Sequence, residues 1–267
     1  MTPIQIKICG ITNARDASAC IKLGAQLIGL NFYPQSPRYI RPKVARQIVE
    51  ALPSNLSAVG VFVDGDPDEI HKTANIAGVR CVQLHGNFSP EIARELAREF
   101  RVILAFSTHA RFRAQDVLPF PDSDILIDAH HSDLRGGTGQ TCNWSAARET
   151  LPFARFLILS GGLNAQNVGF AIEAVGPHAV DVCSGVEKRP GVKDYQALKS
   201  FVTAVRVAGS SAAEQSKEHS HLGCGAGGHL ACRKNASSTR RDARLPHRLA
   251  TERVRPTGGQ DARAPHS

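Results

Sequence analysis

The stretch Gln5-Ile6-Lys7-Ile8-Cys9-Gly10-Ile11-Thr12 begins the first apolar run of the chain and has the pattern that later runs repeat. Its isoleucines alternate with polar residues, as a strand requires, and a glycine breaks the strand before a helix that Thr12 or Asn13 can cap. Cys9 is therefore expected at the carboxyl end of a strand. In α/β proteins this edge faces the ligand, which makes Cys9 a candidate base or nucleophile. The alternative is a buried cysteine that only fills space.

Apolar runs alternate with helical patterns along the whole of residues 1–208. The strands are expected at residues 4–9, 27–32, 58–63, 79–84, 102–106, 125–128, 156–159 and 179–183. Amphipathic stretches of helical length follow most of them, with the least regular one after the sixth strand. Strands joined by helices of this length must pair in parallel. The sequence predicts a single α/β domain, a (β/α)8 barrel of the TIM type, at residues 1–208.

The composition of the 267-residue chain, 42% of it hydrophobic, is sufficient for one such domain. No stretch approaches the roughly 18 apolar residues of a membrane span, and no signal sequence opens the chain, so a cytoplasmic protein without a membrane partner is expected. The seven cysteines form no CxxC pair and no cluster with histidines. They predict reduced thiols and neither a metal site nor a disulfide framework.

The net charge of +8 lies mostly in residues 209–267, which hold ten Lys and Arg against five Asp and Glu. This segment is rich in Ala, Arg, Gly, Ser and His and lacks apolar periodicity, so we expect a basic, low-complexity, disordered extension. Either a natural extension or a change of reading frame would explain its composition. It has no interleaved aromatic residues and no known nucleic-acid module, so no specific nucleic-acid partner is expected.

Polar residues end several of the expected strands. They are Asn31, Asp64, Gln83, His85, Asp128, Ser160 and Ser184. Because a polar group in a packed interior costs desolvation energy, their arrival at one end of the barrel indicates a single site. Asp181 also points inward by alternation with its valine neighbours, although a purely structural ion pair would explain it equally well.

Glycine-rich turns follow the last three strands and predict a phosphate site. Glycine allows the backbone amides to approach an anion closely, and barrels commonly bind phosphate in the loops after strands seven and eight. We expect a phosphorylated sugar as the small-molecule ligand. The candidate phosphate-binding residues are Gly137, Thr138, Gly139, Gly161, Gly162, Ser184 and Gly185.

These motifs, in their order, resemble the phosphoribosylanthranilate isomerase family of tryptophan biosynthesis. The resemblance runs from about residue 5 to 207 and is carried by short motifs at the expected strand ends and in the loops after them. They are Lys7-Ile8-Cys9-Gly10-Ile11-Thr12, Ser36-Pro37-Arg38, Val82-Gln83-Leu84-His85-Gly86, Asp128 before Gly136-Gly137-Thr138-Gly139, Leu159-Ser160-Gly161-Gly162, and Asp181-Val182-Cys183-Ser184-Gly185-Val186-Glu187 with Pro190-Gly191-Val192-Lys193-Asp194. The family more usually has serine where this chain has Cys183.

The resemblance implies an Amadori rearrangement of N-(5′-phosphoribosyl)anthranilate that needs neither cofactor nor metal. It implies that Cys9 is the general base, that Asp128 is the general acid and that Arg38 contacts the anthranilate carboxylate. We expect the pKa of Cys9 to be lowered and that of Asp128 to be raised by their surroundings. Asp133 is the nearest competing acid, in a loop segment that looks solvated.

Three further residues are expected to bind the substrate, and two other classes of protein are alternatives to this family. His85, Gln83 and Asp181 are expected to line the substrate site, and the protein to be a monomer or homodimer. A different phosphoribosyl barrel enzyme is one alternative, although such enzymes usually rely on paired aspartates or a lysine and glutamate set. A binding or regulatory barrel that has lost catalysis is another, although such a loss would ordinarily appear first at Cys9 or Asp128.

Overall fold

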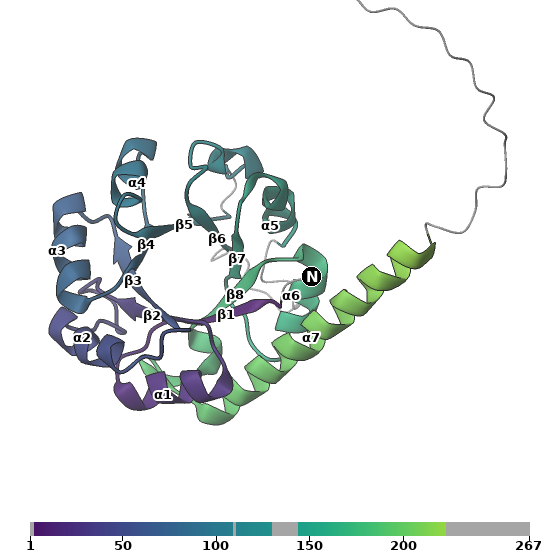
Figure 1. The fold of residues 1–267 in the computed structure, drawn as a ribbon, viewed down its shortest axis with the longest axis horizontal. Helices are drawn as coiled ribbons and strands as arrows, with labels where there is room; N and C mark the ends of the chain where they lie inside the picture. Colours follow the sequence, from purple (N-terminus) through teal and green to yellow (C-terminus); the bar gives the residue numbers. More distant parts are fainter. Residues whose placement is uncertain (1–2, 109–110, 130–143, 223–267) are drawn as a thin grey trace, which may run out of the picture. The chain divides into compact units, whose positions relative to one another are not determined.

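The computed structural model describes residues 3–108, 111–129 and 144–222. Eight strands alternate with helices along the chain and are labelled in Figure 1. The strands are β1 Gln5–Ile8, β2 Leu27–Asn31, β3 Ser57–Val63, β4 Cys81–His85, β5 Arg101–Ser107, β6 Asp124–Asp128, β7 Leu157–Ser160 and β8 Ala179–Val182. The helices are α1 Ala14–Leu23, α2 Pro42–Glu50, α3 Pro67–Ala77, α4 Pro90–Leu96, α5 Trp144–Thr150, α6 Val168–Val175 and α7 Tyr195–Leu222.

The eight strands form a closed parallel barrel in chain order, with β1 paired to both β2 and β8. Figure 1 shows the helices as a ring outside the strands. The predicted (β/α)8 fold is thereby confirmed. Parallel pairing in sequence order brings all strand carboxyl ends to one face of the barrel.

Helix starts follow local capping chemistry. Asn13, one of the two predicted caps, accepts a hydrogen bond from the backbone amide of Asp16 at 2.9 Å and begins α1. Gly24 ends the same helix in a left-handed conformation, at φ 83°, which glycine adopts without steric cost. The helix therefore has the bounds that the sequence predicts, residues 14–23.

Two elements differ from the expectation. Within the described residues, the connection from β5 to β6 holds a single 3-10 turn, Ala114–Val117, where the regular pattern predicts a helix. Prolines at 119 and 121 restrict helix formation just beyond it. The last helix, expected at residues 194–207, continues as α7 to Leu222, beyond the predicted domain boundary at 208. That boundary stays a prediction, and residues 223–267 lie outside the described part.

The barrel interior is layered from an apolar bottom to a polar top. The bottom layer comprises Leu27, Val59, Cys81, Ile103, Leu126, Ile158 and Ala179. A larger apolar core fills the space between strands and helices. Two residues further along the strands, Lys7, Gln83 and Asp181 are buried inside the barrel at 0%, 2% and 5% exposure. Apolar side chains thus support a polar floor beneath the carboxyl face.

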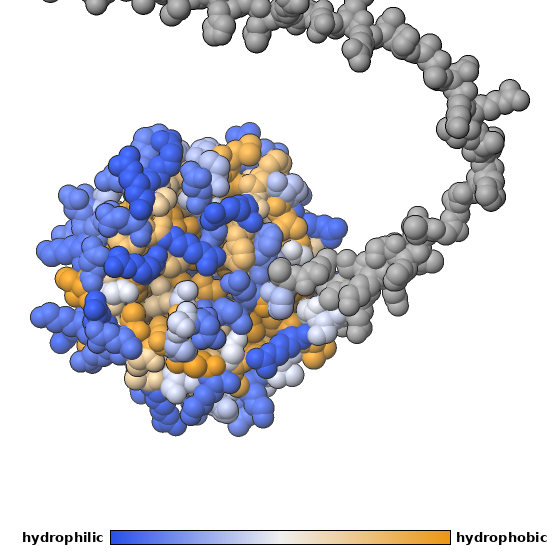
Figure 2. Space-filling model, viewed as in Figure 1, coloured by the Kyte–Doolittle hydropathy of each residue, from blue (hydrophilic) through white to orange (hydrophobic). Residues whose placement is uncertain are grey.

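The outer surface has the polarity expected of an amphipathic ring of helices. In Figure 2 hydrophilic residues cover much of the rim, and hydrophobic residues show between them toward the strands. Across the described ranges, we find no helix with the length and apolar character needed to span a membrane.

Candidate active site

An ion pair between neighbouring strands lies at the centre of the polar floor. The register of β1 on β8 places Lys7 beside Asp181, and Lys7 Nζ donates to Asp181 Oδ1 at 2.9 Å. Their side chains are 0% and 6% exposed. Burial lowers the pKa of Lys7, but the Asp181 carboxylate and the thiol of Cys9 raise it to a net value above the ordinary one. Lys7 is therefore a fixed positive charge inside the barrel.

Cys9 follows directly after β1, and its backbone amide donates to the carbonyl of Val182 at 2.8 Å. Gly29 on β2 leaves room for the thiol, because a Cβ there would lie 2.6 Å from Cys9 Sγ. A hydrogen bond from the Cys183 thiol lowers the pKa of Cys9 against the effect of burial, and Lys7 lowers it further, to about 6. The same hydrogen bond raises the pKa of Cys183. Cys9 is the acidic thiol of this pair.

Gln83 and His85 lie on β4, with Gln83 Nε2 2.6 Å from His85 Nε2. Burial lowers the pKa of His85 below its ordinary value, and the positive charge of Lys7 lowers it further. A neutral imidazole is expected at pH 7. The buried Oε1 of Gln83 has no hydrogen-bond partner among the described residues, which leaves an acceptor inside the barrel.

Asp128 ends β6 and lies between two cavities at the carboxyl face. One cavity, of about 420 Å³, is lined by His85 and the aromatic rings of Phe106, Phe112 and Phe120 as well as Asp128. The second, of about 240 Å³, is lined by Asp128, Ser160, Gly161, Gly162, Leu163, Asp181, Cys183 and Ser184. Asp128 can therefore reach a molecule held in either cavity.

The second cavity has the polar glycine-containing wall predicted for phosphate. Gly161 and Gly162 follow β7, and Ser184 follows β8. Gly185 brings the two turns together, because a Cβ there would collide with the carbonyl oxygen of Leu163. The other three predicted residues, Gly137, Thr138 and Gly139, lie outside the described residues.

Arg38 lies in the loop after β2, which Asn31 and Ser36 hold in place. Asn31 Nδ2 donates to Ser36 Oγ at 3.2 Å, and Ser36 Oγ accepts from the Arg38 amide at 3.2 Å. A Cβ at Gly10 would lie 2.7 Å from Arg38 Cδ and 3.0 Å from Cys183 Sγ, so Arg38 packs over the strand end that carries Cys9. The structure thus brings Arg38 beside the two cysteines.

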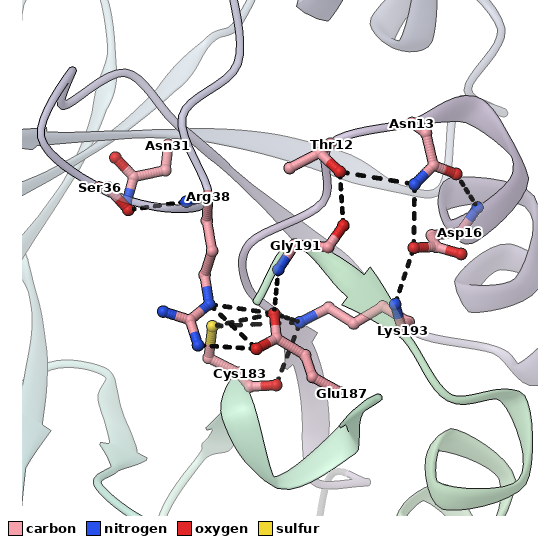
Figure 3. A network of polar contacts seen from close by, with 10 residues as sticks. All are labelled: Thr12, Asn13, Asp16, Asn31, Ser36, Arg38, Cys183, Glu187, Gly191 and Lys193. Carbon is pink, nitrogen blue, oxygen red and sulfur yellow. Dashed lines mark hydrogen bonds and ion pairs between the residues drawn. The ribbon is translucent and has the colours of Figure 1, made fainter. Parts of the chain in front are cut away.

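Two buried charges that the sequence reasoning did not single out complete this side of the site. Glu187 accepts hydrogen bonds from Arg38 at 2.7 to 3.1 Å and from Lys193 Nζ at 3.0 Å. Figure 3 shows Glu187 between the two cations. The side chains of Glu187 and Lys193 are only 3% and 1% exposed. Two opposite charges six residues apart, separated by Pro190-Gly191, are a sequence signal of a charged hairpin.

Groups of His, Cys, Asp and Glu suited to a metal ion do not occur among residues 3–108, 111–129 and 144–222. The described side chains supply instead a low-pKa thiol, an aspartate, a buried ion pair and a serine- and glycine-lined cavity at one barrel face. Such an arrangement defines a barrel enzyme equipped for proton transfer on a small anionic molecule.

Comparison with known proteins narrows that class to one family. Residues 6–204 match the family model for N-(5′-phosphoribosyl)anthranilate (PRA) isomerase. The N-(5′-phosphoribosyl)anthranilate isomerase of Thermotoga maritima is 41% identical over 199 residues, which cover 74% of this chain and 97% of that protein. That of Chlorobium phaeobacteroides is 40% identical and covers 77% and 99%.

Solved structures agree with the sequence match. The phosphoribosyl anthranilate isomerase of T. maritima is 40% identical, with a TM-score of 0.71 over 76% of this chain and 99% of that one. A phosphoribosyl anthranilate isomerase in complex with reduced 1-(o-carboxyphenylamino)-1-deoxyribulose 5-phosphate is 39% identical, with a TM-score of 0.69 and the same coverage. The chain belongs to the phosphoribosylanthranilate isomerase family, and it is an isomerase.

Proposed function

We propose that the protein converts N-(5′-phosphoribosyl)anthranilate to 1-(2-carboxyphenylamino)-1-deoxyribulose 5-phosphate, a step of L-tryptophan biosynthesis, with Asp128 as general acid and Cys9 as general base. The observation that carries the proposal is that the low-pKa thiol of Cys9 and the carboxyl of Asp128 belong to the same barrel face, beside the serine- and glycine-lined cavity. The rearrangement is an internal redox change in which C1 is reduced and C2 is oxidised, so it requires no external oxidant or cofactor.

Asp128 acts in the first step. Its carboxylic acid gives a proton to the furanose ring oxygen, the bond from C1 to that oxygen breaks, and the anthranilate nitrogen supplies its electron pair to form the C1=N iminium. The position of Asp128 at the border of both cavities supports this role, because an acid there can reach the ring of a sugar whose phosphate lies in the cavity beyond Ser160.

Cys9 acts in the second step. Its thiolate removes the proton from C2 of the iminium. The electron pair of that C–H bond forms the C1=C2 double bond of an enaminol, and the π pair of the C1=N bond returns to the nitrogen. Protonation at C1 and loss of the hydroxyl proton at C2 then give the ketose. A pKa lowered to about 6 supports the role, because it favours the thiolate near neutral pH.

The remaining side chains of the site bind and orient the substrate. We assign the anthranilate carboxylate to Arg38, whose planar guanidinium can hold it through two hydrogen bonds. We assign phosphate binding to Gly161, Gly162, Ser184 and Gly185. Gly137, Thr138 and Gly139, which follow β6 in the sequence, are proposed to bind the phosphate as well. Asp181, Gln83 and His85 are proposed to bind the sugar, with the free Oε1 of Gln83 as an acceptor for a ribose hydroxyl.

The proposed setting is the cytoplasm, with the phosphoribosyl compound as the only required ligand. The T. maritima relative is described as a dimeric enzyme from which monomers have been generated. A monomer or a homodimer is accordingly proposed for this chain, and light scattering on the purified protein would distinguish them.

The test is to incubate the purified full-length protein with N-(5′-phosphoribosyl)anthranilate, follow the loss of its fluorescence and identify the ketose product, an isomer of equal mass, by the ketone carbon at C2 in its 13C NMR spectrum. We expect multiple turnovers without added metal or cofactor. A related aldose phosphate that carries an imidazole carboxamide in place of anthranilate serves as the competing substrate. A folded protein that turns over only the competitor would establish the other phosphoribosyl barrel enzyme, and one that turns over neither would favour the binding barrel.

A further inference from the structure

Glu187 lies in a short hairpin after β8 that is bonded to the start of α1, which follows the neighbouring strand β1. Its strands, β9 Glu187–Arg189 and β10 Val192–Lys193, pair antiparallel. Thr12 Oγ1 donates to the carbonyl of Gly191 at 2.6 Å, and the Lys193 amide donates to Asp16 Oδ2 at 2.9 Å. The hairpin backbone, from which the side chains of Glu187 and Lys193 project, is thus attached to the start of α1.

The carboxylate of Glu187 accepts hydrogen bonds from a backbone amide as well as from the two cations that balance its charge. Besides Arg38 and Lys193, the Gly191 amide donates to Oε1 at 3.2 Å and Cys183 Sγ lies 3.9 Å from the same oxygen. Burial raises the pKa of Glu187, but the hydrogen bonds from Arg38 and Lys193 hold it below the ordinary value. Glu187 is therefore an anion fixed in position as well as in charge.

This anion binds one particular edge of the Arg38 guanidinium. Arg38 Nε lies 3.0 Å from Oε1 and Nη2 lies 2.7 Å from Oε2, which is the two-pronged arrangement of arginine on a carboxylate. A guanidinium has a second edge of the same kind, between Nη1 and Nη2. Nη1 makes no hydrogen bond within the described residues, and in Figure 3 it points away from Glu187.

We propose that Glu187, neutralised by Lys193, is the positioning residue that turns the Nη1 and Nη2 edge of Arg38 toward the substrate carboxylate. The proposal rests on the function proposed above, in which Arg38 binds that carboxylate. The side chain of Arg38 is itself 22% exposed and has several rotatable bonds, so it would sample many orientations without a fixed partner. Lys193 compensates the charge of Glu187, which leaves the net positive charge of the three groups available to a ligand.

The test compares two ligands that differ only in the carboxylate. They are reduced 1-(o-carboxyphenylamino)-1-deoxyribulose 5-phosphate and the same compound with phenylamino in place of carboxyphenylamino. Their dissociation constants are measured by calorimetry. The constant of the phenylamino compound divided by that of the carboxyphenylamino compound reports the carboxylate contact alone, and this quotient is the ratio used below. Arg38→Ala should reduce this ratio to about 1, since charge-assisted hydrogen bonds supply it.

Glu187→Asp is the decisive variant, because it keeps the negative charge and withdraws the carboxylate by one methylene. We expect the ratio of dissociation constants to fall by about tenfold, the size of one charge-assisted hydrogen bond. Glu187→Gln should lower the ratio as well. If Glu187 acted only through its charge, the aspartate would leave the ratio unchanged and the glutamine would raise it, because a negative charge near the carboxylate would be lost.

Further variants separate positioning from general damage. In the Arg38→Ala background, Glu187→Asp should leave the ratio unchanged, since nothing remains to be positioned. Glu50→Asp is the matched control, because Glu50 pairs with Arg46 on the exposed face of α2 and should affect neither ligand. Thermal unfolding identifies the variants that fold. Lys193→Met removes the second cation that binds Glu187, so it should also lower the ratio. It replaces any Glu187 variant that fails to fold.

The outcomes distinguish the two proposals. A wild-type ratio near 1, or one that Arg38→Ala leaves unchanged, contradicts the assignment of Arg38 to the carboxylate and removes the role of Glu187 with it. A wild-type ratio that depends on Arg38 but stays the same in folded Glu187 variants keeps the function and overturns the positioning role. A ratio that falls in Glu187→Asp and only when Arg38 is present supports both.

Discussion

Cys9 has an acidic thiol because a neighbouring thiol and two buried cations stabilise its thiolate more than burial opposes it. The hydrogen bond from Cys183 has the largest effect, and Lys7 and Lys193 add favourable charge. Lys7 keeps its charge through the 2.9 Å ion pair with Asp181. The acidity of one residue is therefore set by side chains from β1, from the turn after β8 and from β10 of the hairpin.

The pH dependence of kcat/KM should reveal this thiol. A general base works only when deprotonated, so kcat/KM should rise as the pH increases through the Cys9 pKa of about 6 and level off above it. Cys183→Ala removes the hydrogen-bond donor and should move the rise to higher pH, whereas Cys183→Ser keeps a donor and should leave it near 6. Initial rates measured across the pH range with constant ionic strength test this expectation.

Cys20→Ala provides the control for those profiles. Cys20 lies on α1, where burial raises the pKa of its thiol to about 12, and its loss should not move the rise in kcat/KM. If Cys183→Ala has the wild-type profile, the acidity of Cys9 does not come from Cys183.

The inward-facing residues of β1 and β8 could be predicted from the sequence because a strand has a period of two, whereas the catalytic roles of Cys9 and Asp128 came from the family resemblance. Once the strands are placed, alternation puts Lys7, Cys9 and Asp181 inside the barrel, and the structure has the first and last in contact. Glu187 could not be assigned in this way. Its partner Arg38 is 149 residues away, and only the folded hairpin brings them together.

At the scale of elements, the amino ends of the strands carry a second charged cluster, in which one buried aspartate pairs with two exposed arginines. Asp124 begins β6, is 1% exposed, and accepts from Arg101 Nε at 2.5 Å and from Arg155 Nη2 at 3.1 Å. These contacts tie β6 to the start of β5 and to the segment before β7. In barrels this end serves stability, whereas catalysis belongs to the other face.

Asp124→Asn should therefore lower stability and spare activity. The amide keeps the size of the carboxylate but loses its charge, which should reduce the free energy of unfolding by about 1–3 kcal/mol. Urea denaturation followed by circular dichroism measures the change, beside kcat/KM of the same variant. For comparison, Glu50→Gln breaks only the exposed pair with Arg46 and should cost about 0–0.5 kcal/mol. An equal effect of the two substitutions would contradict this account.

Most elements could be predicted because each carries its own periodicity and end signals, as α1 does with Asn13 and Gly24. The exceptions have a physical cause. The connection from β5 to β6 is a 3-10 turn because the segment before Ser123 includes two prolines and its apolar residues pack as a turn, with Ala114 and Val117 buried. Helical periodicity does not specify such a turn, so the regular repeat predicted a helix there.

At the scale of the molecule, the barrel is closed by residues that precede position 209. The buried side chains of α7 include Leu198, Phe201, Val202 and Val205. The family match ends at residue 204. The catalytic and binding candidates all belong to this part of the chain, so we expect the proposed reaction to proceed without the remaining residues.

A version of the protein that ends at Gly209 should consequently keep its activity. Its kcat/KM should remain within about twofold of the full-length value and its thermal midpoint should change little, since the truncated protein keeps the buried α7 side chains Leu198, Phe201, Val202 and Val205. Both are measured on the two proteins in parallel. A truncated protein that folds but loses turnover would assign residues 210–267 a part in the site.

The central claim is that Cys9 and Asp128 carry out the two proton transfers, and a comparison of single substitutions tests it most directly. The rate of fluorescence loss from N-(5′-phosphoribosyl)anthranilate is measured for the wild type, Cys9→Ala and Asp128→Asn. The controls are Cys20→Ala and Asp122→Asn, which changes an exposed aspartate just before β6. We expect both site variants to fold and to lose about 10²-fold or more in kcat, the usual contribution of a general acid or base, while the controls keep wild-type rates. A folded Cys9→Ala or Asp128→Asn protein with a wild-type kcat would contradict the account.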